Sequence, residues 1–151
     1  MQLIRQNLAK KRAVFFDGKH YHKIWYFSDP RWLQEHFETV QQLCPELPCD
    51  WHYTDSEMTF VMNTIPGTPA SQFEHTDLFV ERIYRACVNN CEQTQPLYHG
   101  DWTLSNMIVD GDRITFIDWD NVNYYPARVV QEKLLSDLHS AFGDKILNCI
   151  G

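Results

Sequence analysis

The sequence predicts an α+β fold, with a small antiparallel sheet in its amino-terminal part and helices in its carboxyl-terminal part. Apolar and polar residues alternate beside the Asp17-Gly18 pair, and such a pair supplies the positive φ angles of a hairpin turn. Farther along, apolar residues recur at the spacing of amphipathic helices. The 151 residues, 44% of them hydrophobic, suffice for one core, so we expect a single domain over residues 1–151.

The first hairpin is expected from Ala13 to Phe27. In its second arm, Tyr21, Lys23 and Trp25 share one face with Phe27, because side chains alternate along a strand. Lys23 is therefore the single charge in an aromatic row. A lysine in that place is either a gatekeeper on an edge strand or a functional cation.

Capping residues and helical spacing predict the later elements. A helix should begin at Pro30, capped by Ser28 or Asp29, and end before Pro45. A second hairpin is expected around Gly111. The other expected elements are, in order, strands at Asp50–Thr54 and Met58–Asn63, a break at Ile65–Pro69, a helix at about Thr76–Cys91, the hairpin strands Asn106–Asp110 and Arg113–Asp118, and a last helix at about Ala127–Phe142.

The second hairpin and the loop before it carry side chains that suit phosphoryl transfer. That reaction needs a carboxylate that orients or deprotonates the attacking hydroxyl, and oxygen ligands that hold a metal ion against the nucleotide phosphates. Asp101 can supply the first, and Asn106 and Asp118 the second, because a short hairpin returns the chain to its starting point. The alternative is that these residues only cap turns, where Asp and Asn are favoured.

Segments of this region resemble the motifs of a known enzyme group. His99-Gly100-Asp101, then Asn106, and then Ile117-Asp118-Trp119-Asp120 at the end of the next strand are similar to the catalytic and metal-binding motifs of the aminoglycoside phosphotransferase and choline kinase group. The resemblance implies a two-lobed protein-kinase-like fold. Residues 1–65 would form a reduced amino-terminal lobe with an antiparallel sheet, and residues 66–151 a truncated helical carboxyl-terminal lobe.

The resemblance also implies roles for these residues. Asp101 is expected to be the catalytic base, and His99 to complete the catalytic set by organising the loop through hydrogen bonds. Asn106 and Asp118 are expected to bind Mg²⁺. Asp120 would support these ligands or bind a second metal ion.

In the amino-terminal lobe the resemblance implies an ATP site. Lys23 corresponds to the lysine that contacts the α and β phosphates, and the hinge between the lobes would meet the adenine ring with Met62, Asn63 and Ile65.

Parts of the group's pattern are missing from this sequence. No glycine precedes Gly18, so nothing resembles the glycine-rich loop that covers the phosphates. Glu35 and Glu38 fall opposite the apolar stripe of the first helix, so Lys23 receives no assigned ion-pair partner. The helices that ordinarily build the acceptor site are also missing, which predicts a very open cleft, a site completed by another subunit, or no acceptor binding at all.

These patterns predict a kinase that moves the γ-phosphate of ATP to a hydroxyl of a small molecule, such as a sugar, a lipid head group or an aminoglycoside-like compound. The first alternative is a pseudokinase or nucleotide-binding regulatory module without turnover, because the phosphate loop is missing. The second is a metal-dependent hydrolase that uses His99, Asp101, Asp118 and Asp120 without a nucleotide.

Charge and hydropathy limit the partners. The net charge of -7 argues against nucleic acid and mildly favours a neutral or cationic acceptor. No apolar run has the length of a membrane span and no export signal is evident, so we expect a cytoplasmic protein with reduced cysteines. The apolar stripe of Val130, Leu134 and Leu138 is expected to lie uncovered, which predicts a homodimer.

Overall fold

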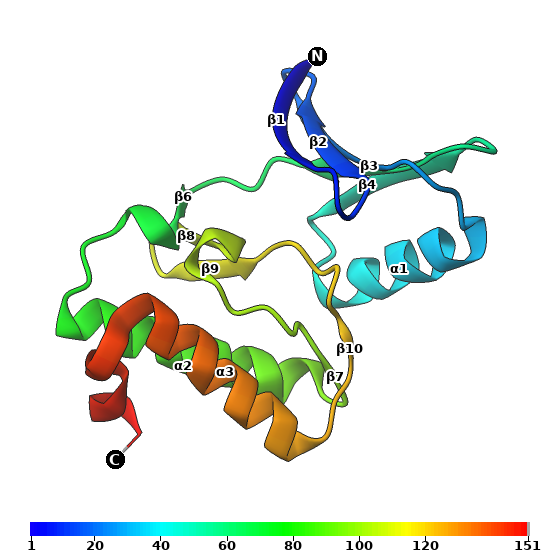
Figure 1. The fold of residues 1–151 in the computed structure, drawn as a ribbon. Helices are drawn as coiled ribbons and strands as arrows, with labels where there is room; N and C mark the ends of the chain where they lie inside the picture. The colour runs from blue at the N-terminus through cyan, green and yellow to red at the C-terminus, as the bar shows by residue number, and fades with distance from the viewer. Residues whose placement is uncertain (151) are drawn as a thin grey trace. The chain divides into compact units, whose positions relative to one another are not determined.

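The computed structural model describes residues 1–150 and divides the chain into two compact units, Met1–Ile65 and Pro66–Gly151. The first unit is an antiparallel sheet with one long helix, and the second combines two long helices with short strands (Figure 1). The expected α+β class is therefore confirmed. That the two units act as one kinase-like domain stays a prediction.

The sheet of the first unit has five antiparallel strands in the order β1-β2-β3-β5-β4. Its strand β3 lies in the centre, so its backbone is paired on both sides. The bounds are Gln2–Asn7 for β1, Arg12–Phe16 for β2, His20–Trp25 for β3, Pro48–Tyr53 for β4 and Met58–Asn63 for β5.

Helix α1 (Pro30–Leu43) packs on one face of this sheet (Figure 1). It begins as expected, because the Asp29 side chain accepts a hydrogen bond from the backbone amide of Trp32 and Pro30 takes the first helical position. Aromatic contacts join helix and sheet. The Trp32 ring meets Trp25 of β3 edge to face at 5.4 Å, and the His36 ring lies 5.4 Å from the Phe60 ring of β5.

Strand β1 was not expected from the sequence. Its apolar residues Leu3 and Ile4 are half exposed, and no side chain of the strand is buried. Backbone pairing with β2, from Gln2 opposite Phe16 to Asn7 opposite Arg12, holds it in place. An edge strand held by its backbone has no need of the side-chain alternation from which strands are recognised.

The second unit is built around two long helices, α2 (Asp77–Thr94) and α3 (Ala127–Phe142). The first is capped by the Thr76 hydroxyl, which accepts from the amide of Phe79. The other elements are β6 (Thr68–Pro69), η1 (Ala70–Gln72), β7 (Leu97–Tyr98), η2 (Leu104–Asn106), β8 (Met107–Asp110), β9 (Arg113–Phe116), β10 (Asn123–Tyr124) and η3 (Gly143–Cys149); the strands pair as β6-β8-β9 and β10-β7.

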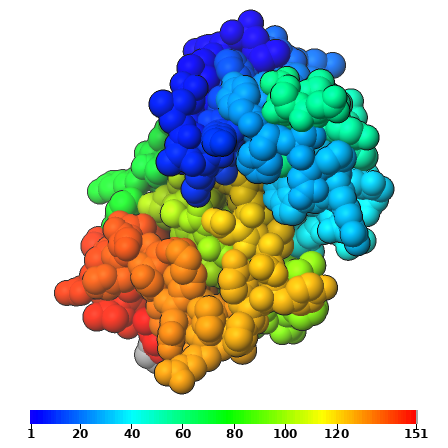
Figure 2. Space-filling model, turned by 45° about the vertical axis from the view of Figure 1, so that its right-hand side comes forward, coloured from blue at the N-terminus to red at the C-terminus, as the bar shows by residue number. Residues whose placement is uncertain are grey.

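The apolar stripe of α3 is buried within the chain, contrary to expectation. Val130 and Leu134 are each 6% exposed and Leu138 is fully buried, because α3 packs against α2 and η3. The opposite face lies at the surface, where α3 forms the orange part of Figure 2. The reason for expecting a homodimer was therefore wrong, and the homodimer itself stays a prediction.

Two further sequence expectations concern thiols and membrane spans. All five cysteines are free thiols. Within residues 1–150, no helix combines the length and the apolar character that crossing a lipid bilayer requires.

Candidate active site

His99 lies in the second unit, directly after β7, and organises the surrounding loop. Its ring is fully buried, with the Trp119 ring at 4.5 Å. The Nε2 atom lies 2.7 Å from the backbone carbonyl oxygen of Ile117, and the backbone amide of Asp101 donates to Nδ1 over 3.2 Å. A carbonyl accepts and an amide donates, so these contacts define the neutral tautomer with its proton on Nε2. His99 thus connects the backbone at Asp101 to the residue before Asp118.

Burial lowers the pKa of His99, because the imidazolium form would lose its hydration. The hydrogen bond to Ile117 and the nearby carboxylates of Asp118, Asp101 and Asp120 oppose this effect without reversing it. A neutral ring with both nitrogen atoms in hydrogen bonds has no atom left to act on a substrate. These contacts fit the expectation that His99 organises the loop through hydrogen bonds.

Asn106 provides a second connection between the same segments. Its side-chain nitrogen donates to the backbone carbonyl of Asp101 over 3.3 Å. Its backbone carbonyl accepts from the backbone amide of Ile117 over 2.8 Å. Asn106 is only 6% exposed. Because the amide nitrogen is used in the loop, the side-chain oxygen is the atom available as a cation ligand.

Asp118 lies outside the strand in which the sequence had placed it. Strand β9 ends at Phe116, and the Asp118 backbone adopts a φ of 59° in the left-handed region. That conformation turns the chain sharply, and Asp and Asn adopt it more readily than most residues. Strained backbone of this kind is concentrated at functional sites.

Gly100 is required by space as well as by conformation. Its φ is 84°, and a Cβ atom there would lie 2.7 Å from the backbone oxygen of Asn121 and 3.0 Å from the hydroxyl of Tyr125. That hydroxyl donates to the same Asn121 oxygen over 2.7 Å. The loop that carries Asp101 therefore packs directly against the segment that follows Asp118.

The second unit therefore brings the backbones of Asp101, Asn106 and Ile117 together. Asp101, Asp118 and Asp120 are all half-buried. Among residues 1–150, no three His, Cys, Asp or Glu side chains are grouped closely enough to hold a metal ion. The hydrolase alternative requires such a cluster and so gains no support. The expected kinase does not require one, because a magnesium ion can take most of its ligands from water and phosphate.

In the first unit, Lys23 is 3% exposed on the central strand β3, so the edge-strand interpretation was wrong. Its Nζ lies 5.8 Å from the centre of the Trp25 ring. Helix α1 buries His36 on its sheet-facing side, whereas Glu35 and Glu38 are exposed, as expected. That Lys23 belongs to the same site as Asp101 stays a prediction.

The expected hinge residues lie at the end of β5 and after it. Met62 pairs with Tyr21 of β3. Asn63 is bound to the loop between α1 and β4, because its backbone amide donates to the carbonyl of Leu47 over 2.9 Å and its side chain donates to that of Glu46 over 3.1 Å. Ile65 is the last residue of the first unit. Their contact with a nucleotide stays a prediction.

Sequence reasoning missed Asp137, whose carboxylate accepts a hydrogen bond from the amide of Trp102 over 3.0 Å. The one local signal was an acidic residue directly before Leu138 of the apolar stripe of α3. An acidic residue beside such a stripe is more often solvated than bonded to a distant loop.

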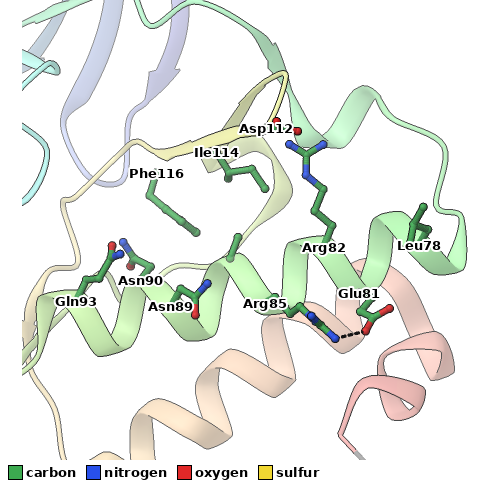
Figure 3. A pocket seen from close by; sticks show the side chains of 11 residues that line it. Leu78, Glu81, Arg82, Arg85, Asn89, Asn90, Gln93, Asp112, Ile114 and Phe116 are labelled. Carbon is green, nitrogen blue, oxygen red and sulfur yellow. Dashed lines mark hydrogen bonds and ion pairs between the residues drawn. The ribbon is translucent and has the colours of Figure 1, made fainter.

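A separate groove of about 670 Å³ runs between α2 and β9 (Figure 3). Phe116 and Ile114 of β9 and Arg82 and Asn89 of α2 are among its lining residues. Arg82 donates to the carbonyl of Gly111. Neither Asp101, Asn106 nor Asp118 lines this groove, so it is not part of the candidate active site.

Solved structures show the fold. The aminoglycoside phosphotransferase APH(3'')-Id from Streptomyces rimosus aligns over 99% of this chain and 81% of its own, with a TM-score of 0.69 and 17% identity. Monomeric WbdD aligns over 95% of this chain and 41% of its own, with a TM-score of 0.63 and 17% identity. A WbdD structure described as a bifunctional kinase-methyltransferase has a TM-score of 0.59 at 17% identity, over 93% of this chain and 38% of its own.

This chain therefore spans about two fifths of the length of WbdD. At these identities the likeness concerns the fold alone, and it confirms the expected protein-kinase-like fold with an antiparallel amino-terminal sheet. No curated protein matches the sequence. A family model described as "Phosphotransferase enzyme family" matches residues 29–129, which is more than half of the chain. The chain belongs to this phosphotransferase family, as the motifs around Asp101 and Asp118 had indicated.

Proposed function

We propose that this protein is a kinase that transfers the γ-phosphate of ATP to a hydroxyl group of a small molecule in the presence of Mg²⁺. The observation that carries the proposal is the pair of connections, through His99 and Asn106, between the backbone of Asp101 and that of Ile117. Phosphoryl transfer depends mainly on positioning and on electrostatic stabilisation. A loop held in this way supports such a role.

In this proposal Asp101 orients the acceptor hydroxyl and accepts its proton. His99 acts by holding the loop. Asn106 and Asp118 would hold Mg²⁺, since an amide oxygen and a carboxylate are the hard oxygen ligands that this ion prefers. The bound ion would neutralise charge on the phosphates. Asp120 would support these ligands or bind a second ion.

The first unit would contribute the nucleotide contacts. Lys23 is proposed to bind the α and β phosphates. Its position on the central strand β3, which is paired on both sides, supports this role because a rigid element holds the cation in place. Met62, Asn63 and Ile65 would meet the adenine ring.

The acceptor is proposed to be neutral or cationic. The chain carries 20 acidic and 13 basic residues, so an anionic acceptor would be repelled at long range. The name of one similar structure, an aminoglycoside phosphotransferase, fits a cationic acceptor with hydroxyl groups. Sugars and lipid head groups are the other classes to screen.

The test is ATP consumption with a panel of hydroxyl compounds, for the wild type and for Asp101→Asn. Loss of the base should lower kcat by about 1,000-fold, because general bases contribute roughly 100- to 10,000-fold. Asp110→Asn is the matched control, since it neutralises an exposed aspartate of β8. Full turnover in Asp101→Asn would remove this residue from the role of base.

Thermal unfolding with ATP separates a kinase from a binding module. ATP should raise the unfolding temperature more in the presence of Mg²⁺ than in its absence, because a ligand that binds only the folded state stabilises it. Such a shift without turnover on any acceptor would favour the nucleotide-binding module.

A further inference from the structure

The groove between α2 and β9 lies outside the candidate active site and has two different walls. On α2 the lining residues recur every three or four positions from Leu78 to Gln93, so they form one stripe of the helix. The core of the second unit packs against another face of α2, where Phe79, Ile83 and Cys87 are buried. The stripe that lines the groove therefore has no part in this core.

The opposite wall is β9, which lies at the edge of the sheet β6-β8-β9. Directly after β9, the amide of Ile117 donates to the carbonyl of Asn106 over 2.8 Å, so every second residue of β9 directs its backbone groups to β8. The backbone groups of Ile114 and Phe116, which lie between these positions, point away from β8. The Phe116 carbonyl accepts from Nε1 of Trp119 over 2.9 Å, which agrees with this direction.

Strand β9 therefore has three outward backbone groups without a strand partner: the N–H and C=O of Ile114 and the N–H of Phe116. None of the three is paired with another backbone group in residues 1–150. The side chains of both residues extend from β9 toward α2 and give the groove an apolar floor (Figure 3). A strand edge of this kind pairs with an added strand through main-chain hydrogen bonds. Because this edge is short, contacts from α2 must supply the rest of the affinity.

Amide side chains of α2 can make those contacts. Asn89, Asn90 and Gln93 line the part of the groove near Phe116 (Figure 3). An amide both donates and accepts, as a peptide group does, so it can bond to an extended backbone of any sequence. The Oδ1 atom of Asn90 is shielded from solvent and accepts no hydrogen bond from residues 1–150. A buried acceptor without a donor is destabilising, so the Asn90 amide gains by turning to an N–H of a bound peptide.

The charges of the groove cancel, and this selects the class of partner. Glu81 and Arg85 form an ion pair over 2.7 Å, and Arg82 donates to the carbonyl of Gly111, directly before Asp112. A nucleic acid or an anionic lipid surface would therefore meet no net positive charge. A strand edge, amide side chains and an apolar floor instead match an extended peptide without net charge.

We infer that the groove between α2 and β9 binds an extended, uncharged peptide segment of a partner protein, which adds to β9 as a further strand. The stripe from Leu78 to Gln93 is about 22 Å long at about 1.5 Å per residue, and about seven extended residues span this length. The inference goes beyond the proposed function and does not depend on it, because such binding needs neither ATP nor a hydroxyl acceptor.

Selection from a phage-displayed library of random peptides of about seven residues tests the inference. Enriched peptides are synthesised, and their Kd is measured by calorimetry for the wild type and for Ile114→Pro. Proline removes the outward N–H and is tolerated on an edge strand, so this variant should bind at least about 10-fold more weakly. A selection that enriches no peptide, or equal affinity of the two proteins, would overturn the inference.

Asn90→Leu separates binding from folding. Leucine is of similar size and removes the unpaired acceptor, so the unfolding temperature should stay constant or rise, while peptide affinity should fall by at least about threefold. Gln42→Leu is the matched control, because it replaces an exposed amide side chain of α1 and should change neither quantity. If Ile114→Pro does not fold, Asn90→Leu carries the affinity test. Unchanged affinity in Asn90→Leu would mean that the peptides bind elsewhere.

Hydrogen exchange measured by NMR distinguishes strand addition from other modes of binding. A bound peptide should slow exchange at the amides of Ile114 and Phe116 by at least about 10-fold, because these groups gain hydrogen bonds. The amides of Arg113 and Thr115 point to β8 and should change little. Equal protection of all four amides, or of none, would contradict the addition of a strand to β9.

Light scattering without peptide tests the other occupant, a second copy of this chain. Dimers that dissociate in Ile114→Pro would show that copies of this chain pair through β9, and would overturn the partner peptide. The result is also distinguishable from that of the proposed function. Peptide binding without turnover supports this inference and opposes the kinase proposal, whereas turnover without peptide binding does the reverse.

Discussion

At Asp118 the backbone conformation and the expected metal ligand coincide in one residue. A φ of 59° costs a non-glycine residue on the order of 1 kcal/mol, and Asp or Asn bears this cost with the least strain. The position immediately follows Ile117, whose carbonyl is bound by His99. The sharp turn therefore begins where the backbone is anchored.

Two substitutions at Asp118 should separate its conformation from its charge. Asp118→Asn keeps a side chain that tolerates the left-handed region, so stability should change by less than about 1 kcal/mol while turnover falls by at least about 100-fold. Asp118→Val should cost a further 1–2 kcal/mol or so, because a β-branched residue is strained there. Urea unfolding and the ATP assay measure the two effects. Equal stability of the Asn and Val variants would show that the backbone relaxes.

His99 links stability to pH. Burial lowers its pKa in the folded state, so the unfolded chain binds more protons as the pH falls. Its contribution to stability is therefore fully present above the ordinary value of about 6.5 and is lost as the pH falls from there towards the folded pKa.

We expect the free energy of unfolding to decline between about pH 7 and pH 5, and His99→Gln to remove part of this decline. The other six histidines are present in both proteins, so the difference between the two series of urea unfolding experiments isolates His99. A pH dependence identical in both proteins would contradict the assignment of a neutral, buried ring.

At the scale of elements, the loop before η2 and the segment after β9 form one packed structure. The fit depends on a glycine, since the Asn121 oxygen would lie 2.7 Å from a Cβ atom at position 100. The hydroxyl of Tyr125 donates a hydrogen bond to the same oxygen and lies 3.0 Å from that Cβ position. Neither segment has room to shift without moving the other.

Gly100→Ala should destabilise the protein by more than about 2 kcal/mol, because a steric clash is added to the conformational strain of a positive φ. Gly111→Ala is the matched control. Its φ is also positive, at 59°, but no atom lies within 4 Å of the added Cβ, so only the strain of about 1 kcal/mol should be seen. The midpoint of urea unfolding gives both values, and equal losses would exclude the clash.

For the whole molecule, the excess of acidic residues defines a long-range field. The net charge of -7 attracts cations, and salt screens this attraction because the Debye length falls from about 30 Å at 10 mM to about 8 Å at 150 mM ionic strength. A cationic acceptor and a neutral one should therefore respond differently to salt.

With saturating ATP, kcat/KM for an aminoglycoside-like acceptor should fall severalfold between about 10 mM and 150 mM salt, whereas that for a neutral sugar should stay constant. Steady-state assays at constant pH and Mg²⁺ concentration measure both. The same salt response for both acceptors would show that the net charge has no part in acceptor selection.

The sequence predicted most elements because their side chains are buried on one face. The expected bounds of α3, Ala127–Phe142, and of β5, Met58–Asn63, coincide with those observed. Edge strand β1 escaped prediction, since its side chains are not buried and only its backbone is paired. Asp118 was wrongly placed inside a strand, because a single left-handed residue leaves no periodic signal.

By itself the sequence predicted which residues would carry the chemistry, since Asp101, Asn106 and Asp118 stand in recognisable order and spacing. Only the tertiary structure decided how the loop around them is held. The His99 ring is hydrogen-bonded to two backbone segments, and the Asp137 carboxylate accepts from the amide of Trp102. Periodicity records the burial of side chains within one element. A hydrogen bond between a side chain and a distant backbone group depends on their approach in space, and it leaves no pattern in either segment.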